Sequence, residues 1–311
     1  MLLSFSDDII YKVILVKKNY TFALITVSIW STMAAVVKKM LSDIPNLEAL
    51  SISSFFAVAF LLIINIKNGN IKKLNTYSLK DYSVMGGLGF VGLFLYSALY
   101  YYGLANLTSQ EACILNYLWP IMLVIFSCII LKEKMTVMKA FAMICSFVGI
   151  IILSTGSGAL TSGNKIFGII SCIVAAACYG LFSVLNKKYD YDQNISMMIF
   201  WLVTGVCALI AGLITEEWVM IKGVEWIGMI WLGVVVDGLA YLLWALALKG
   251  VDNTAKIANL AFLTPFLSLI ISALVLKEKI ATRSFVALVF IIGGILLQNL
   301  CELLLQKKRK V

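Results

Sequence analysis

The chain has 311 residues, of which 62% are apolar and only 13% are charged. A soluble domain carries about a quarter charged residues, so this composition excludes an ordinary soluble protein and indicates a surface that faces lipid. The net charge of +9 lies in short clusters between apolar runs and in a basic tail at 307–310, a distribution that favours lipid headgroups and excludes a nucleic-acid partner.

Ten apolar segments follow one another along the chain. Each is long enough for a helix that crosses a hydrocarbon core about 30 Å thick, which takes roughly 20 residues. Helices are required at this depth because lipid offers no hydrogen-bond partner to backbone groups. In chain order, we predict spans at 20–37, 47–66, 83–105, 109–131, 136–154, 166–186, 195–214, 226–248, 254–276 and 284–301. The predicted fold class is therefore an all-α membrane protein with ten transmembrane helices.

Lysine and arginine fall unequally on the two sides of these spans. If the N-terminus is inside, 18 of the 25 basic residues lie in cytoplasmic segments and 7 in external ones. This is the bias that membrane proteins show. We therefore expect both termini in the cytoplasm, with residues 1–19 as an amphipathic lead-in and residues 302–311 as a basic tail.

The second part of the chain repeats the first. Residues 120–153 match residues 265–298 without a gap at an offset of 145, and each stretch begins with a proline. Within them, the sequence Leu-Lys-Glu-Lys occurs at both 131–134 and 276–279. An identical tetrapeptide at the same distance from an aligned proline is hard to obtain by chance, so we infer an internal duplication.

The duplication predicts the architecture. We divide the chain into a first five-helix repeat at 20–154, a linker at 155–165 and a second five-helix repeat at 166–301. Because five is odd, the second repeat enters the membrane upside down. Inverted repeats are typical of secondary transporters, whose binding site lies near the midplane between the halves.

Four short motifs carry a resemblance to a known family. They are Trp30-Ser31-Thr32-Met33, Asn116-Tyr117-Leu118-Trp119-Pro120, Gly238-x-Ala240-Tyr241-x-x-Trp244 and Thr264-Pro265. Over about residues 20–300, the chain resembles the drug/metabolite transporter superfamily with EamA-type repeats, and within it the aromatic amino-acid exporters. The resemblance implies an inner-membrane protein with both termini inside and a central cavity lined by helices 1, 3, 4, 6, 8 and 9. One position departs from the family pattern, because Asp237 stands where an apolar residue precedes the glycine of the eighth span.

Asp237 lies near the middle of the predicted eighth span. A carboxylate at that depth costs roughly 2.5–3.5 kcal/mol on insertion scales, so it should face a cavity or a partner. Tyr241 and Trp244 follow at i+4 and i+7 and share its helix face, and an acid beside two aromatic rings suits a cation or an amphipathic amino acid. We predict that all three bind substrate, with Asp237 as the partner of an ammonium group or as a proton carrier. The structural alternative is a protonated aspartic acid bonded to a neighbouring helix.

Pro120 interrupts the fourth span. Proline has no N–H to donate to the carbonyl of Asn116, and a freed carbonyl at membrane depth needs water, a side chain or a ligand. We therefore predict Asn116, Tyr117 and Trp119 as substrate-binding residues, with a simple packing kink as the alternative. Pro265 frees a carbonyl in the same way in the second repeat, although among small apolar neighbours.

Aromatic residues occupy matching places in the two repeats. Trp30 matches Tyr179 in the first helix of each repeat, and Tyr96 matches Tyr241 in the third. Rings on paired helices near a midplane can stack against a substrate that carries a ring, so we predict these four as substrate-binding residues, with core packing as the alternative. We assign 100–102, three consecutive tyrosines at the outer end of the third span, mainly to the interfacial belt.

Glu111 stands at the start of the predicted fourth span. It ends the sequence Thr108-Ser109-Gln110-Glu111, the pattern of a capping box, in which the first and last residues bond to each other's backbone N–H groups. We therefore predict a structural role for Glu111 rather than a catalytic one.

Two classes of function remain. A secondary transporter would expose a midplane site alternately to each side; its substrates would be small and amphipathic, with export of aromatic or hydrophobic amino acids first and cationic amines or drugs as the alternative. A membrane-embedded enzyme would need clustered nucleophiles, bases or metal ligands at one depth, and the chain has no histidine. We therefore expect no catalytic residue, no metal site and no cofactor. Without a nucleotide-binding loop, transport would be driven by proton coupling or by solute exchange.

Overall fold

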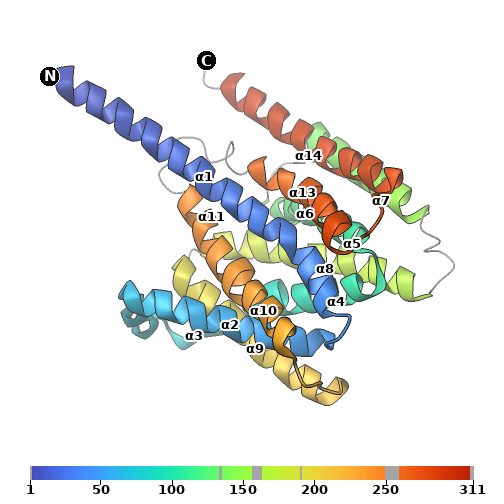
Figure 1. Ribbon diagram of the computed structural model, residues 1–311. Helices are drawn as coiled ribbons and strands as arrows, with labels where there is room; N and C mark the ends of the chain where they lie inside the picture. The colour runs from blue at the N-terminus through green and yellow to red at the C-terminus, as the bar shows by residue number, and fades with distance from the viewer. Residues whose placement is uncertain (1, 133–134, 156–162, 190, 249–258, 309–311) are drawn as a thin grey trace.

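The protein is an all-helical membrane protein. The computed structural model describes residues 2–132, 135–155, 163–189, 191–248 and 259–308, and every regular element in these ranges is a helix (Figure 1). Seven helical segments of the described chain are long and apolar enough to cross a membrane. The predicted fifth, ninth and tenth spans coincide with shorter apolar helices. The fold class is therefore confirmed as all-α, and the chain crosses the membrane several times.

The described part of the first half contains seven α-helices. These are α1 (Leu2–Met40), α2 (Asn46–Lys67), α3 (Leu79–Gly89), α4 (Tyr96–Asn106), α5 (Ser109–Asn116), α6 (Trp119–Ile130) and α7 (Val137–Thr155). A 3₁₀ segment at Asn70–Thr76 follows α2, and a π-helical segment at Phe90–Leu95 joins α3 to α4. Because α1 has no break, the predicted lead-in 1–19 continues directly into the first span from residue 2 onward.

The second half repeats this order of helices. Its described α-helices are α8 (Gly163–Tyr189), α9 (Gln193–Thr215), α10 (Gly223–Ile230), α11 (Ala240–Leu248), α13 (Thr264–Val275) and α14 (Thr282–Lys308). A π-helical segment at Trp231–Leu239 joins α10 to α11, and a 3₁₀ segment at Asn259–Leu263 precedes α13. The third and eighth spans therefore both pass through a π-helical segment.

The two halves also agree in local backbone conformation. Lys132 and Lys277, the second residues of the two Leu-Lys-Glu-Lys sequences, have φ angles of 55° and 56° and are the only described residues other than glycine with positive φ. Few residues other than glycine adopt this left-handed conformation. The helices before them, α6 and α13, therefore end with the same turn, as expected if the two halves are copies.

Corresponding helices pack in corresponding ways. Helices α2 and α9 lie together at one edge of the molecule, and α7 and α14 lie together at the other (Figure 1). Between these pairs, α8 packs against α6 and α4, whereas α1 packs against α13 and α11. The first helix of each half thus contacts the broken helix of the opposite half.

The first helices of the two halves run in opposite directions. The Lys38 ammonium group, near the end of α1, donates to the carbonyl of Leu107 at 2.6 Å. Gly168, near the start of α8, packs against that same residue. The end of α1 and the start of α8 therefore share one end of the molecule, and Lys187 lies roughly 30 Å away along α8 at 1.5 Å per residue.

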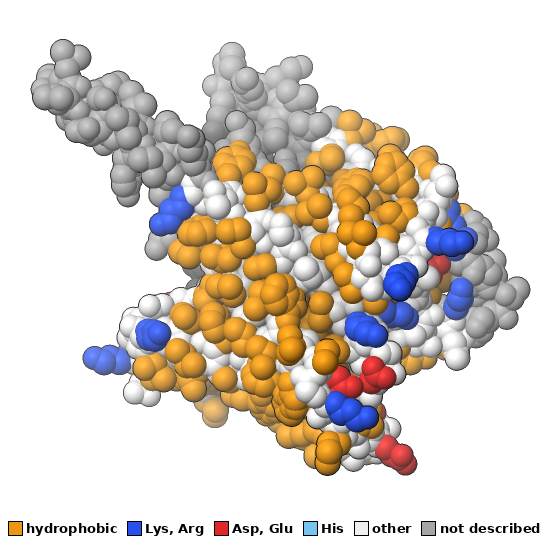
Figure 2. Space-filling model, in the orientation of Figure 1, with side chains coloured by type: hydrophobic (Ala, Val, Ile, Leu, Met, Phe, Trp, Pro, Cys, Tyr) orange, Lys and Arg blue, Asp and Glu red, His pale blue; other side chains and the backbone are white. Residues whose placement is uncertain are grey.

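The outer surface is apolar. Figure 2 shows hydrophobic side chains over much of one face, with charged side chains mostly toward its margins. Large apolar residues are exposed on several helices, including Ile63 on α2, Ile214 on α9 and Leu274 on α13. A soluble monomer rarely exposes so much apolar surface, which agrees with a belt that faces lipid.

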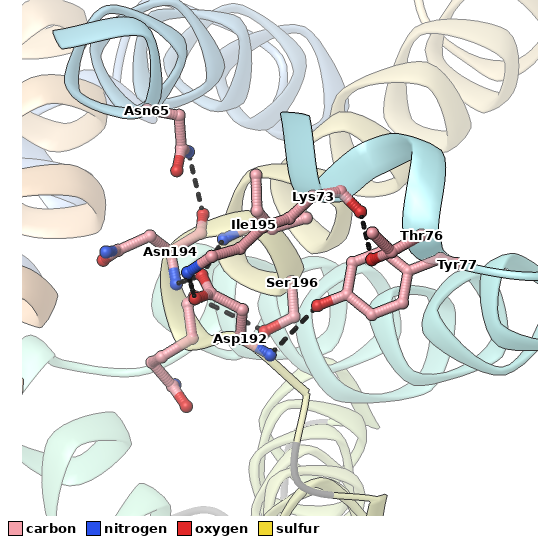
Figure 3. A network of polar contacts seen from close by, with 9 residues as sticks. Asn65, Lys73, Thr76, Tyr77, Asp192, Asn194, Ile195 and Ser196 are labelled. Carbon is pink, nitrogen blue, oxygen red and sulfur yellow. Dashed lines mark hydrogen bonds and ion pairs between the residues drawn. The ribbon is translucent and has the colours of Figure 1, made fainter. Parts of the chain in front are cut away.

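Polar contacts join the two halves at the end where α8 stops. The Lys73 ammonium group forms an ion pair with the Asp192 carboxylate at 2.5 Å, and the backbone N–H of Asp192 donates to the Tyr77 hydroxyl at 3.2 Å (Figure 3). The Asn65 amide of α2 donates to the carbonyl of Asn194 at 3.1 Å. The end of the second span and the segment that follows it thus hold the start of α9.

Candidate functional site

A cavity of about 460 Å³ lies between the two halves of the chain. This volume is within the range of small-molecule pockets in proteins. All nine residues predicted to bind substrate line it, namely Trp30, Tyr96, Asn116, Tyr117, Trp119, Tyr179, Asp237, Tyr241 and Trp244. They come from four helical spans of the two halves and from the break between α5 and α6. The structure therefore brings the predicted residues together, while their role in binding stays a prediction.

The π-helical segments position residues of the third and eighth spans at the cavity. Asp237 lies within the segment Trp231–Leu239, and its side chain is only 4% exposed. Tyr241 and Trp244 line the same cavity from α11, as their helical spacing predicts. None of the ion pairs between described residues includes Asp237. π-Helical segments occur frequently at functional sites, and here one of nine residues carries a buried acid.

The fourth span is broken at the predicted place. Helix α5 ends at Asn116 and α6 begins at Trp119. The side-chain amide of Asn116 donates to the Tyr96 hydroxyl at 3.1 Å, whereas its amide oxygen is buried and has no hydrogen-bond partner among the residues that the structure describes. The break therefore presents a polar group to the cavity, which a simple packing kink does not require.

The corresponding break in the ninth span is stabilised by the first half. Pro265 cannot donate to the carbonyl of Ala261, and this carbonyl accepts a hydrogen bond from the Tyr117 hydroxyl at 3.0 Å. A freed carbonyl at this depth needs a partner, and here a tyrosine from the other break provides it. The two breaks thus contact each other at the wall of the cavity.

Aromatic rings form two groups on the cavity wall. Trp30 of α1 packs against Tyr241 and Trp244, with ring centroids 5.4 and 5.3 Å apart. Tyr179 of α8 packs against Tyr96 at 4.9 Å and against Trp119, the first residue of α6, at 5.3 Å. Each group joins helices of both halves, and centroid distances of this size are typical of favourable ring contacts.

The assignment of the three consecutive tyrosines to an interfacial belt is wrong for two of them. Tyr100 is 2% exposed and lines the cavity, and Tyr101 is 1% exposed in the core. Tyr102 alone is well exposed, at 38%. Successive residues on a helix point about 100° apart, so three neighbours cannot share one environment.

Several polar residues of the cavity were not predicted from the sequence. Ser183 and Asn186 line it from α8, and Gln193 lines it from the exposed start of α9. The first two lie at i+4 and i+7 from Tyr179 and so could have been found by helical spacing. Because Gln193 is exposed, the cavity reaches the surface at the end of the molecule where α8 stops.

Charged residues join the two halves at the end of the molecule opposite to the one where α8 stops. The predicted capping box is confirmed, because the backbone N–H of Glu111 donates to the Thr108 hydroxyl at 3.1 Å and the backbone N–H of Thr108 donates to the Glu111 carboxylate at 3.2 Å. The Glu278 carboxylate, from the second half, accepts hydrogen bonds at 2.9 Å from both the backbone N–H and the hydroxyl of Ser109. The Arg283 guanidinium lies 3.6 Å from the Glu111 carboxylate. Acidic groups are favourable at a helix N-terminus, so these contacts hold the start of α5 to the segment between α13 and α14.

Comparison with known proteins agrees with the fold and the repeat. The model of the EamA-like transporter family matches residues 17–155 and again residues 166–300. The uncharacterized transporter YoaV of Bacillus subtilis is 26% identical over 87% of this chain and 93% of its own length. The aromatic amino acid exporter YddG of Ancylobacter novellus is 23% identical over 66% of this chain and 72% of its own. A solved crystal structure, 19% identical in sequence, matches with a TM-score of 0.65 over 92% of this chain and 97% of that one. Two family matches that together span nearly the whole chain, on an all-helical fold with an internal repeat, show that the chain belongs to the EamA-like transporter family.

Proposed function

We propose that this protein is a secondary transporter that moves small amphipathic metabolites across the cell's inner membrane by alternating access. In this proposal, ten helices form two inverted five-helix repeats, both termini are cytoplasmic, and the nine cavity residues bind the solute. Export of aromatic or hydrophobic amino acids is the first candidate activity. The resemblance to the aromatic amino acid exporter YddG supports this choice, as do the aromatic rings on the cavity wall.

The observation that carries the proposal is a cavity between the two halves whose wall includes an exposed residue at one end. The cavity lies between the two halves and reaches the surface near Gln193. At the other end, Glu278 and Arg283 of the second half contact Ser109 and Glu111 of the first. A cavity between two halves whose contacts at one end can separate while the other end closes is what an alternating-access cycle requires.

The opposite state requires these polar contacts to separate. Glu278 would leave the start of α5, and the halves would close around the end where Gln193 lies. These contacts are partly buried, because Ser109 is fully buried and the Glu111 side chain is only 6% exposed. A hydrogen bond to a charged group contributes about 1.5–3 kcal/mol net. In this proposal, a solute gradient, proton coupling or exchange offsets the loss of these contacts and drives the cycle.

A counterflow screen tests the proposal. Purified protein is reconstituted in sealed liposomes that are loaded with one unlabelled solute, and uptake of the same labelled solute is measured. We expect accumulation above that of protein-free liposomes for at least one aromatic or hydrophobic amino acid or amine. If none of these solutes accumulates, transport of small amphipathic metabolites is contradicted.

A further inference from the structure

The polar groups around Tyr96 can accept hydrogen bonds from a ligand. The Tyr96 hydroxyl accepts from the side-chain amide of Asn116, and both residues line the same cavity as Asp237. The amide oxygen of Asn116 has no hydrogen-bond partner in the described part of the chain, and the Asp237 carboxylate is nearly fully buried without an ion pair there. A carboxylate and an amide oxygen are the partners that a protonated amine needs.

The described residues that line the cavity offer no positively charged partner to a carboxylate. Asp237 is the only charged side chain among the described residues that line it. A broken helix can present free N–H groups to an anion, but the start of α6 is poor in them. Pro120 has no N–H, and the N–H groups of Ile121 and Met122 both donate to the carbonyl of Leu118 at 3.0 Å. An anionic group in this cavity would therefore find only neutral donors, such as the hydroxyls of Ser97 and Ser268, and it would face Asp237, which is also acidic.

The aromatic rings of the cavity wall also favour a cation over an anion. Trp30, Tyr241 and Trp244 form one ring cluster, and the last two follow Asp237 in the same span. An ammonium group within about 6 Å of a ring centroid is attracted to the ring face, and more strongly once it is desolvated. The rings also provide an apolar wall for the uncharged part of a solute.

From these observations we propose that the cavity selects organic cations, namely primary amines attached to an aromatic or apolar group, over zwitterions that carry the same group. Asp237 pairs with the ammonium group, the Asn116 amide oxygen accepts a second hydrogen bond from it, and the ring cluster packs against the rest of the solute. This inference rests on the proposed transport of small amphipathic solutes and, within it, places amines ahead of the amino acids that the resemblance to an exporter suggests. It predicts the order of preference tryptamine, then tryptophan, then indole-3-propionate, which share the indole ring and differ in charge.

Two assays of the same three compounds test the proposal. The first is counterflow into liposomes, and the second is equilibrium binding of labelled tryptamine to the detergent-solubilised protein, with tryptophan and indole-3-propionate as competitors. In the wild-type protein, tryptamine should be favoured over tryptophan by about tenfold or more, which corresponds to about 1.4 kcal/mol. Indole-3-propionate should neither be transported nor compete.

The variant Asp237→Asn removes the charge and keeps the shape of the side chain. We expect it to lose tryptamine binding and transport by about tenfold or more, while its preference for tryptamine over tryptophan disappears. Asp43→Asn is the matched control, because Asp43 is an exposed acid in the turn between α1 and α2; it should behave like the wild type. If Asp237→Asn does not fold, the order of the three compounds in the wild-type protein still decides the proposal.

The outcomes separate this inference from the proposed function. If tryptophan is transported at least as well as tryptamine, or if Asp237→Asn transports tryptamine at the wild-type rate, cation selection is overturned and transport stands. If no solute crosses the membrane but tryptamine binds with dependence on Asp237, transport is contradicted and the binding site is supported.

Discussion

The fourth and ninth spans break at the same place but carry different chemistry. In both, an α-helix begins one residue before a proline, at Trp119 in α6 and at Thr264 in α13. The first break carries Asn116 and Tyr117, and the second carries Ala261 and a phenylalanine in the matching positions. One break thus supplies hydrogen-bonding side chains, and the other supplies a freed carbonyl. The duplication preserved the backbone while the side chains diverged.

The third and eighth spans differ in the same manner. At the repeat offset of 145, Asp237 corresponds to Gly92, and both lie in π-helical segments. A side chain at Gly92 would collide with the ring of Phe182, so the first half has no room for an acid at this position. A symmetric backbone thus encloses an asymmetric cavity, with the acidic group on one side only.

The contact between α8 and α6 offers the largest expected change in stability. Gly180 of α8 faces α6 so closely that an added Cβ would lie 2.7 Å from the Cβ of Met122 and 2.8 Å from the backbone nitrogen of Leu123. In Gly180→Ala, the backbone of α6 must therefore shift, and overpacking of this kind costs about 1–3 kcal/mol. We expect a clearly lower melting temperature in detergent.

A glycine of α14 provides the control for this variant. An added Cβ at Gly293 meets nothing within 4 Å, and alanine is the better helix former. Gly293→Ala should therefore keep or slightly raise the melting temperature. Equal losses in the two variants would contradict the close approach of α8 and α6.

Loss of the hydrogen bond between the two helix breaks should cause the next largest loss of stability. Tyr117→Phe removes the donor to the Ala261 carbonyl and leaves a buried acceptor without that partner, which costs about 1–2 kcal/mol. We expect a lower melting temperature in detergent than for the wild type. Tyr102→Phe is the matched control, because the Tyr102 side chain is exposed and should tolerate loss of its hydroxyl. An unchanged melting temperature for Tyr117→Phe would show that the second break does not depend on the first half.

The sequence predicted those features that depend on pattern alone. Hydropathy indicated the spans, and the offset of 145 located the matching breaks at Pro120 and Pro265. The positions that converge on the cavity followed from this repeat and from the family motifs. Because each of these features is local, or is repeated in the chain, the sequence contains it directly.

Features that depend on how distant segments meet were not predicted. The sequence indicated that Pro265 frees a carbonyl, but it did not reveal that Tyr117 would bond to it, since that requires knowledge of how the halves dock. In the same way, nothing local showed that Glu278 would cap α5 or that Tyr100, rather than Tyr102, would turn toward the cavity. Such contacts are set by tertiary packing and not by the pattern of one span.

The smallest change in stability is expected for the ion pair between Lys73 and Asp192, which joins the halves at the surface. Burial alone would raise the pKa of Asp192, but the hydrogen bonds from Lys73 and from the backbone N–H of Ile195 outweigh it, so the pKa of this carboxyl lies below its usual value. The carboxylate therefore stabilises the folded protein above the usual carboxyl range, and this contribution is lost as the pH falls through the lowered pKa.

The variant Asp192→Asn measures this contribution, because asparagine also caps the start of α9 well. At neutral pH it should be less stable than the wild type by about 0.2–1 kcal/mol, the usual size of a surface ion pair. Melting curves from pH 7 down to pH 3 should show the difference shrinking toward zero. A difference that grows in acid would contradict a lowered pKa for Asp192.

The relative direction of the two halves can be measured most directly by labelling from one side of the membrane. Lys39 near the end of α1 and Lys188 near the end of α8 are both exposed and can each be replaced, as Lys39→Cys and Lys188→Cys, in a chain whose native cysteines have been removed. With a membrane-impermeant thiol reagent added to intact cells, the cysteine at position 39 should be labelled at once and the one at position 188 only after the membrane is opened. Labelling of both from the same side would contradict two inverted halves around one cavity.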